Sequence, residues 1–279
     1  ERNYGERLAA LAAGLEAGIE KDEHLLFQKK GKIPAQDYGA LAFTLTRLKD
    51  IHWALKHEIL ANIDRTAALG CVDRFDTPPS AVRILQEMNL ILNNLDRLEV
   101  RGRDSAGISL LCILDQTLFL AFQEKMASLG LLEELEQRQQ HPILVNRTVT
   151  IHDRGPQGVC LAFVYKVAAE VVRLGDNVRF LRDQITNDRL LQHMIRVPIA
   201  RHSIVAHTRW ASVGEISQPN CHPVDNMPGG ASGIIHVCLN GDIDNYQDLR
   251  QRFERETGMP IPAEISTDTK IIPLQIQRH

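Results

Sequence analysis

The spacing of apolar residues changes from a helical to a strand-like pattern about halfway along the chain. From Leu41 to Ile63, apolar residues recur at the three- and four-residue intervals of a helix. After about residue 148, β-branched and aromatic residues occur in short runs between turn-forming residues. Helices followed by strands are typical of the α+β class. We therefore predict an α+β fold.

The helical half divides into three segments. The run from Leu41 ends at Gly70, a residue that commonly caps helices, and we expect Trp53 to pack within this bundle. Ser80 is the predicted N-cap of a second helix. A third helical segment covers about residues 114–137.

The second half mixes strands with helices. A helix is predicted from about residue 174 to 191, and another from Tyr246 to Thr257, ending at Gly258. The loop from Ser212 to Ser232 is long for a compact domain, which indicates a functional site. Four segments are predicted as strands: Thr148 to Ile151, Val159 to Val167, Ser203 to His207 and Ile234 to Leu239.

Composition excludes two classes of partner. The 32 basic and 35 acidic residues give a net charge of −3, so there is no basic excess to hold nucleic acid or an anionic membrane. No apolar run approaches the ~20 residues that cross a bilayer. The first thirty residues carry charges throughout, unlike a secretory signal. We expect a cytoplasmic protein.

Cysteine and histidine positions do not favour a metal site or disulfides. The odd number of cysteines and their apolar surroundings favour buried free thiols. His207, Cys221 and His222 invite a zinc interpretation, but a closed zinc site needs a second closely spaced ligand pair. We expect neither a metal nor a cofactor. The five cysteines are Cys71, Cys112, Cys160, Cys221 and Cys238.

Four short strings carry the functional information in this chain. Each alone is weak evidence, but their order, with His222-Pro223 between the second and third, is specific. They are Arg101-Gly102-Arg103-Asp104-Ser105-Ala106-Gly107, His207-Thr208-Arg209-Trp210, Asn240-Gly241-Asp242-Ile243-Asp244-Asn245 and Ser266-Thr267-Asp268-Thr269.

This set resembles the class II glutamine amidotransferases, which use an N-terminal nucleophile. The first two strings resemble the glutamine–fructose-6-phosphate aminotransferase (glucosamine-6-phosphate synthase) branch. The resemblance covers about residues 81–107 and 158–272. It implies the αββα four-layer sandwich of Ntn hydrolases, here with an added N-terminal helical region.

The resemblance also implies a domain organisation. Residues 1–80 are expected to be a helical insertion or extension. Residues 81–279 are expected to be a glutamine amidotransferase type 2 domain that is incomplete at both ends. This domain carries a helical insertion at about 108–143 that the synthase lacks.

Binding of free glutamine requires groups for its carboxylate and its ammonium. A guanidinium can hold the carboxylate through two hydrogen bonds, and a carboxylate can hold the ammonium. The family pattern gives the first role to Arg209 and the second to Asp268. It places Ser212 among the substrate-binding residues.

Attack on the glutamine amide creates an oxyanion that needs two preorganised donors. The family pattern assigns this role to the Asn240 side chain and the Gly241 backbone N–H. Trp210 resembles the tryptophan that gates ammonia passage in the synthase, but a core aromatic beside a strand is an equal alternative. Arg101 and Asp104 are expected to support the site by packing, with a helix-exit ion pair as the alternative.

The family nucleophile is an N-terminal cysteine whose own α-amine is the base, whereas residue 1 here is glutamate. We expect the nucleophile upstream of Glu1. Cys71 is a weaker alternative because it follows a helix and would need chain cleavage. Val213 replaces a histidine of the synthase pattern, which indicates a divergent relative.

The resemblance implies an enzyme that hydrolyses L-glutamine to glutamate. It would supply ammonia to C-terminal sugar isomerase domains acting on a fructose-6-phosphate-like sugar, within a homo-oligomer. Two alternatives stay open. The ammonia acceptor can differ, or the chain can be a catalytically inactive glutamine-binding scaffold.

Overall fold

The chain forms two compact units in the structure, a computed structural model that describes residues 2–70, 77–169, 173–212, 214–227 and 233–278. The units are Glu1–Ala68 and Leu69–His279. The division lies before residue 80, where the sequence predicted it. The reason is that Leu69 is 1% exposed and packs in the core of the second unit. No helix in the described part of the chain is long and apolar enough to cross a membrane.

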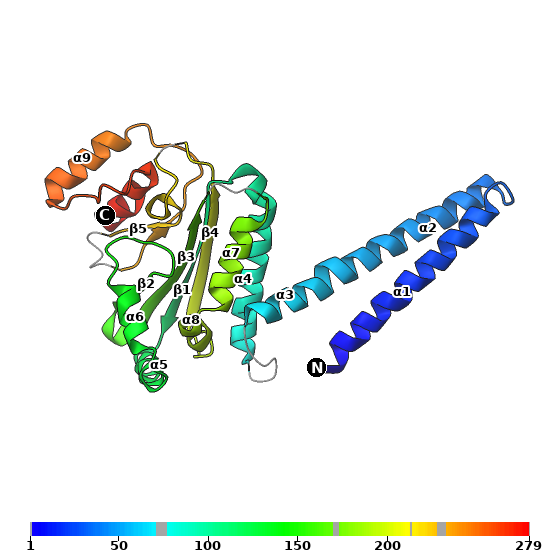
Figure 1. Cartoon of the computed structure of the whole chain (residues 1–279), viewed down its shortest axis with the longest axis horizontal. Helices are drawn as coiled ribbons and strands as arrows, with labels where there is room; N and C mark the ends of the chain where they lie inside the picture. The colour runs from blue at the N-terminus through cyan, green and yellow to red at the C-terminus, as the bar shows by residue number, and fades with distance from the viewer. Residues whose placement is uncertain (1, 71–76, 170–172, 213, 228–232, 279) are drawn as a thin grey trace. The chain divides into compact units, whose positions relative to one another are not determined.

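The first unit is a helical hairpin (Figure 1). Its helices are α1 (Arg2–Lys29) and α2 (Ala35–Trp53), which continues through a π-helical segment (Ala54–Leu60) into α3 (Ala61–Leu69). A two-helix hairpin buries only one stripe of each helix, which here contains Ala12, Ile19, Leu45 and Leu55. Trp53 lies off this stripe and is 54% exposed, so the prediction that it packs within the bundle is wrong.

The first described helix that lies entirely within the second unit is α4 (Pro79–Leu98), which is strongly amphipathic. Pro78 is its N-cap and Pro79 its first residue, so the predicted cap at Ser80 is wrong by two positions. The physical reason is that proline has a suitable φ for the first helical position and lacks the N–H that would remain unpaired there. A 3₁₀ turn (Glu99–Arg101) ends the helix.

A four-stranded antiparallel sheet with strand order β2-β3-β1-β4 forms the centre of this unit. Its strands are β1 (Ser105–Leu114), β2 (Val149–Asp153), β3 (Val159–Ala168) and β4 (Arg201–Arg209). Strand predictions for the last three are confirmed. The sequence did not indicate β1, so the helical segment predicted at 108–143 begins only at Gln116, with α5 (Gln116–Ser128) and α6 (Leu132–Gln139).

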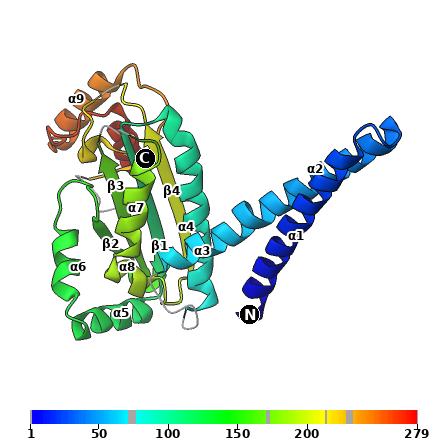
Figure 2. The same cartoon turned by 45° about the vertical axis from the view of Figure 1, so that its right-hand side comes forward.

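Helices cover one face of the sheet. Both views show α4 and α7 (Asp176–Thr186) side by side on the same face of the sheet (Figures 1 and 2), with α4 against β4 and α7 against β3 and β1. Alternate residues of β1, from Ala106 to Leu114, point into this core and are fully buried. The helix predicted at 174–191 is interrupted at Asp188, which caps a separate helix, α8 (Arg189–Met194).

The other face of the sheet meets a second, smaller layer. This layer contains the antiparallel pair β5 (Val224–Asp225) and β6 (His236–Val237), so the predicted strand at 234–239 is shorter than expected. Ser109 of β1 contacts it through a 2.7 Å hydrogen bond to Nδ1 of His236. Helices α9 (Tyr246–Thr257) and α10 (Ile271–Arg278) follow, and Gly258 ends α9 with a φ of +67°, as predicted.

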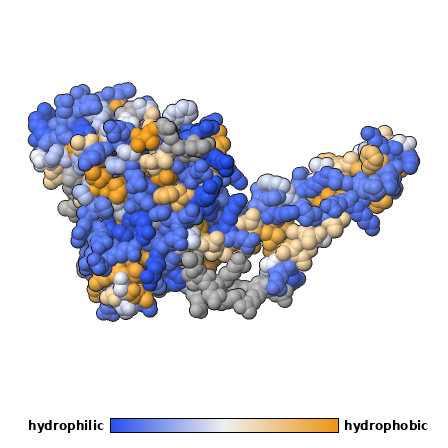
Figure 3. Space-filling view, in the orientation of Figure 1, coloured by the Kyte–Doolittle hydropathy of each residue, from blue (hydrophilic) through white to orange (hydrophobic). Residues whose placement is uncertain are grey.

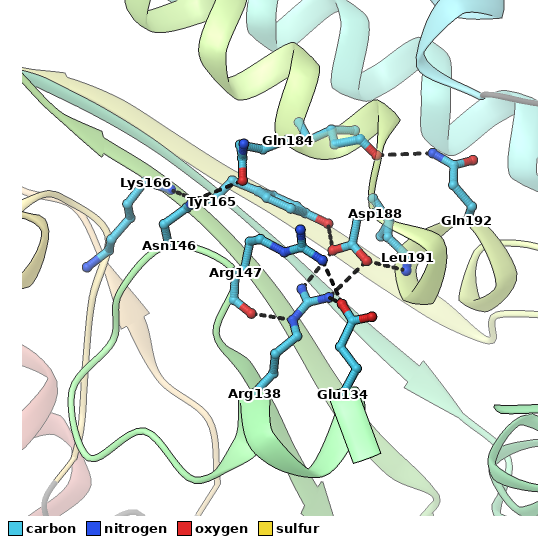
Figure 4. A network of polar contacts seen from close by, with 11 residues as sticks. Glu134, Arg138, Asn146, Arg147, Tyr165, Lys166, Gln184, Asp188, Leu191 and Gln192 are labelled. Carbon is cyan, nitrogen blue, oxygen red and sulfur yellow. Dashed lines mark hydrogen bonds and ion pairs between the residues drawn. The ribbon is translucent and has the colours of Figure 1, made fainter. Parts of the chain in front are cut away.

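A buried ion pair attaches α6 to the sheet and to α8 (Figure 4). Asp188 accepts hydrogen bonds from Arg138 Nη1 at 2.9 Å and Nη2 at 2.7 Å. The Tyr165 hydroxyl donates to the same carboxylate at 2.7 Å, and the Leu191 N–H at 3.2 Å. Burial opposes ionisation of Asp188, but the hydrogen bonds and charge of Arg138, together with the hydrogen bonds from Tyr165 and Leu191, outweigh it and lower its pKa.

We predict that Arg138→Met destabilises the chain by about 3–5 kcal/mol, because it leaves the Asp188 carboxylate buried without its cation. Urea denaturation followed by circular dichroism measures the change. The control is Arg83→Met, which removes an exposed helix ion pair with Glu87 and should change stability by less than about 0.5 kcal/mol. Equal effects of the two variants would contradict a structural role for the buried pair.

Candidate active site

Arg209 is the last residue of β4 and pairs with Ser105 of β1 at the end of the sheet. The residue is 4% exposed. Its Nη1 donates to the carbonyl oxygen of Glu215 at 3.3 Å. Burial lowers the pKa of the guanidinium, while Cys221, Asp104 and Asp268 act in the opposite direction. Arg209 is therefore a buried cation within electrostatic reach of Asp268.

Asp268 comes from the 3₁₀ turn Asp268–Lys270 and is 3% exposed. Its Oδ2 accepts a 2.7 Å hydrogen bond from the backbone N–H of Ile243. Its Oδ1 accepts one from the Thr269 hydroxyl at 3.3 Å. The carboxylate thus fixes the loop that carries Asn240 and Gly241.

Asn240 and Gly241 lie at the surface of the molecule. Gly241 has a φ of +149°, a backbone conformation that favours glycine. Among the described residues other than its chain neighbours, none has an atom within 4 Å of the position that a Cβ would take there. The Ser212 hydroxyl donates to Asp242 in this loop. The structure therefore brings four of the predicted segments to one end of the sheet.

Trp210 and Asp104 have different roles in this region. Trp210 is 74% exposed, so the interpretation as a core aromatic is wrong. The backbone N–H of Asp104 donates to the carbonyl of Arg209 at 3.2 Å, and its carboxylate accepts from the Ala211 N–H at 2.7 Å. Asp104 thus holds the chain on both sides of Trp210, whereas Arg101 is exposed.

Asn220 organises the site but was not predicted. Its side chain is fully buried. Its Oδ1 accepts from the N–H groups of Ser266 at 2.7 Å and Thr267 at 2.8 Å. Its Nδ2 donates to Ser217 Oγ at 2.8 Å and to the Glu264 carbonyl at 3.0 Å. Asn220 therefore joins the loop after Arg209 to the segment that carries Asp268. The only signal in the sequence was its place in the long loop.

The loop after Arg209 makes close backbone contacts with β1 and with the segment before Asp268. A Cβ at position 107 would lie 2.1 Å from the carbonyl oxygen of His222, so only glycine fits there. A Cβ on Gly214, whose φ is +87°, would similarly lie 2.9 Å from Ser266. The glycines let the loop approach both the sheet and the Asp268 segment.

Two histidines and a lysine lie in the same region as Arg209. The rings of His207 and His222 are 4.8 Å apart. Burial, and then the positive charges nearby, lower the pKa of both, that of His222 to about 3. Both imidazoles are therefore neutral near pH 7. Lys166 of β3 is fully buried, and burial lowers its pKa to about 8. Its Nζ donates to the carbonyls of Leu144 at 2.7 Å and Gln218 at 3.3 Å.

Within the described ranges, no group of three His, Cys, Asp or Glu side chains is arranged to hold a metal ion. Cys112, Cys160 and Cys221 are buried free thiols, and Cys238 is partly buried. Cys71 and Val213 lie outside the described residues.

Comparison with known proteins identifies relatives of this chain. It is 27% identical over 186 residues to glutamine–fructose-6-phosphate aminotransferase (isomerizing) 1 of Arabidopsis thaliana, which covers 67% of the chain and 19% of that enzyme. The Bordetella pertussis aminotransferase is 28% identical over 143 residues, 51% of the chain and 22% of the enzyme. The Bos taurus aminotransferase 2 is 33% identical over 100 residues, 36% of the chain and 14% of the enzyme.

The chain resembles the glutamine–fructose-6-phosphate aminotransferases. It spans about a fifth of the length of the first of these relatives. Modest identity over part of the chain is what a divergent relative would show. No family model matches the chain, and no solved structure matches it.

We predict that Asn220→Ala destabilises the second unit by about 1–3 kcal/mol, because the N–H groups of Ser266 and Thr267 lose their buried acceptor. Urea denaturation measures the loss. The control is Asn187→Ala, which removes an exposed side chain bonded to the Asp183 carbonyl, with an expected effect within about 0.5 kcal/mol. An Asn220→Ala variant as stable as the control would show that the Asp268 segment does not depend on this amide.

Proposed function

We propose that this chain binds L-glutamine and contributes to its hydrolysis to glutamate in a class II glutamine amidotransferase of the cytoplasm. The observation that carries the proposal is the buried pair of opposite charges, Arg209 and Asp268, at one end of the sheet. A free α-amino acid is a zwitterion, and such a pair complements both of its charged groups. The relatives are named as enzymes that use glutamine, which supports the same substrate.

The local electrostatics also favour an amino-acid carboxylate beside Arg209. His207 and His222 are neutral near pH 7, so they do not repel the ammonium of glutamine. Arg209 and Lys166 are cationic groups in a region of low dielectric, where a charge interacts more strongly than in water. We assign the glutamine carboxylate to Arg209 and the ammonium to Asp268.

Hydrolysis requires stabilisation of an oxyanion and a nucleophile. We propose the Asn240 side chain and the Gly241 N–H as the oxyanion donors. Their exposed position and the open space beside Gly241 leave room for a substrate. Ser212 supports this loop through Asp242, and Trp210, which is exposed, is proposed to cover the substrate. We assign the nucleophilic thiol to no residue of the described part of the chain.

The layers of the second unit are consistent with an Ntn-hydrolase αββα sandwich, which we propose as its fold. Helices α4 and α7 form an outer layer, and the four-stranded sheet is the next. The small β5–β6 sheet faces it, and α10 packs against that small sheet. We further propose that ammonia passes to a sugar isomerase domain, as the isomerizing relatives suggest.

Calorimetric titration of the chain with L-glutamine tests the binding proposal. We expect Arg209→Ala to weaken binding at least about tenfold, because the carboxylate loses charge-assisted hydrogen bonds. Binding of 4-aminobutanamide, which lacks the carboxylate, should be weaker overall but equal in the two proteins. The matched control is Arg201→Ala, an exposed residue at the start of the same strand, which should bind glutamine normally.

Near-UV circular dichroism checks that the Arg209 variant is folded. Glutamine affinity that is unchanged in Arg209→Ala would show the carboxylate assignment to be wrong. A folded wild-type chain with no affinity for glutamine would overturn the proposed function itself.

The acceptor is tested with the full-length gene product, including any sequence before Glu1. We expect its glutaminase activity to rise when fructose 6-phosphate is added, because the relatives are named for that acceptor. The control is glucose 6-phosphate, which has the same charge. Glutaminase without stimulation would favour a different acceptor, and a protein that binds glutamine without hydrolysing it would favour the scaffold alternative.

A further inference from the structure

The helical hairpin of the first unit has one charged side and one apolar side. On the charged side, Glu16 pairs with Lys56 at 2.9 Å, and Glu23 pairs with Lys49. These pairs set an antiparallel register between α1 and α2. Successive residues of a helix are 100° apart, so Leu25 lies on the side of α1 opposite to Glu16. The buried residues between the two helices separate these two sides.

That other side contains an apolar groove of about 210 Å³. Leucines from both helices line it, and Leu25 and Leu41 remain 42% and 49% exposed. Figure 3 shows apolar side chains among charged ones on the face of the hairpin that is turned to the viewer. An amphipathic hairpin with an exposed apolar side is stabilised when a partner covers that side. The groove is lined by Asp22, Leu25, Leu26, Lys29, Leu41, Thr44, Leu45 and Leu48.

The charges at the rim of the groove indicate what covers it. Asp22 and Lys29 lie two helical turns apart on α1, placed symmetrically about Leu25 and Leu26. A two-fold axis between these leucines would set a second α1 antiparallel to the first. Asp22 would then face Lys29 of the partner subunit, and the leucines would face each other. This self-complementary pattern is what an isologous contact requires.

The second helix of the hairpin fits the same axis. In the register of the ion pairs, Leu25 and Leu26 lie level with the part of α2 between Leu45 and Leu48. The axis would therefore pass between Leu45 and Leu48, so that Leu45 meets Leu48 of the partner subunit. Both helices of the hairpin would meet their copies with leucine against leucine.

We propose that the groove between α1 and α2 is a homodimer interface, in which two hairpins associate as an antiparallel four-helix bundle. The inference concerns the first unit only and does not depend on the proposed glutamine chemistry. Because the groove is short, the dimer is expected to be weak, with a Kd in roughly the micromolar range.

Charge reversal in the full 279-residue chain tests the proposal. Sedimentation velocity should show a concentration-dependent dimer of the wild type. Asp22→Lys should weaken it at least about tenfold, because two pairs of like charges then face each other across the axis. Lys29→Asp should do the same. The double variant, with both charges exchanged, should restore the wild-type Kd.

Glu20→Lys is the matched control, because it makes the same charge change at an exposed position on the opposite side of α1. It should leave the dimer intact. Leu25→Asp should yield a monomer with unchanged helical circular dichroism. The proposal is overturned if the wild type is monomeric at all concentrations, if the double variant does not recover, or if Glu20→Lys weakens the dimer as much as Asp22→Lys.

Discussion

The second unit depends on the burial of β1 on both of its faces. One face carries apolar side chains into the core beneath α4 and α7. The first half of the other face carries small residues, of which Ser109 bonds to His236 and Gly107 touches the backbone at His222. Small side chains on this face let the loop after Arg209 lie directly on the sheet. The absence of a Cβ at position 107 therefore sets how closely the backbone at His222 approaches the sheet.

Much of this arrangement could be predicted from sequence, but β1 could not. The β-branched runs of β3 and β4 and the capped pattern of α9 indicated those elements correctly. In β1, apolar residues occupy both faces over Leu110–Leu114, so the run has no alternation that separates a strand from a helix. For Trp53 the side-chain type was misleading. An aromatic residue suggested burial, but Trp53 lies off the stripe that is buried between the two helices and is therefore exposed.

The site shows a similar division. The strings that contain Arg209, Asn240 and Asp268 could be recognised because they match a known family pattern. Asn220 acts by accepting backbone hydrogen bonds from a segment about 46 residues away. A single asparagine in a loop rich in turn residues gives no sign of such partners. Long-range backbone bonding of this kind is visible only once the chain is folded.

The order of strands also has consequences for how fast the unit folds. β1 pairs with β3 on one side, but its other neighbour is β4, where Ser105 meets Arg209 about a hundred residues along the chain. Closing so long a loop costs entropy before any contact offsets it, and folds dominated by distant pairings form slowly. The β1–β3 pair can form first, over a shorter loop. The end of β4, where Arg209 lies, would then be among the last parts of the sheet to assemble.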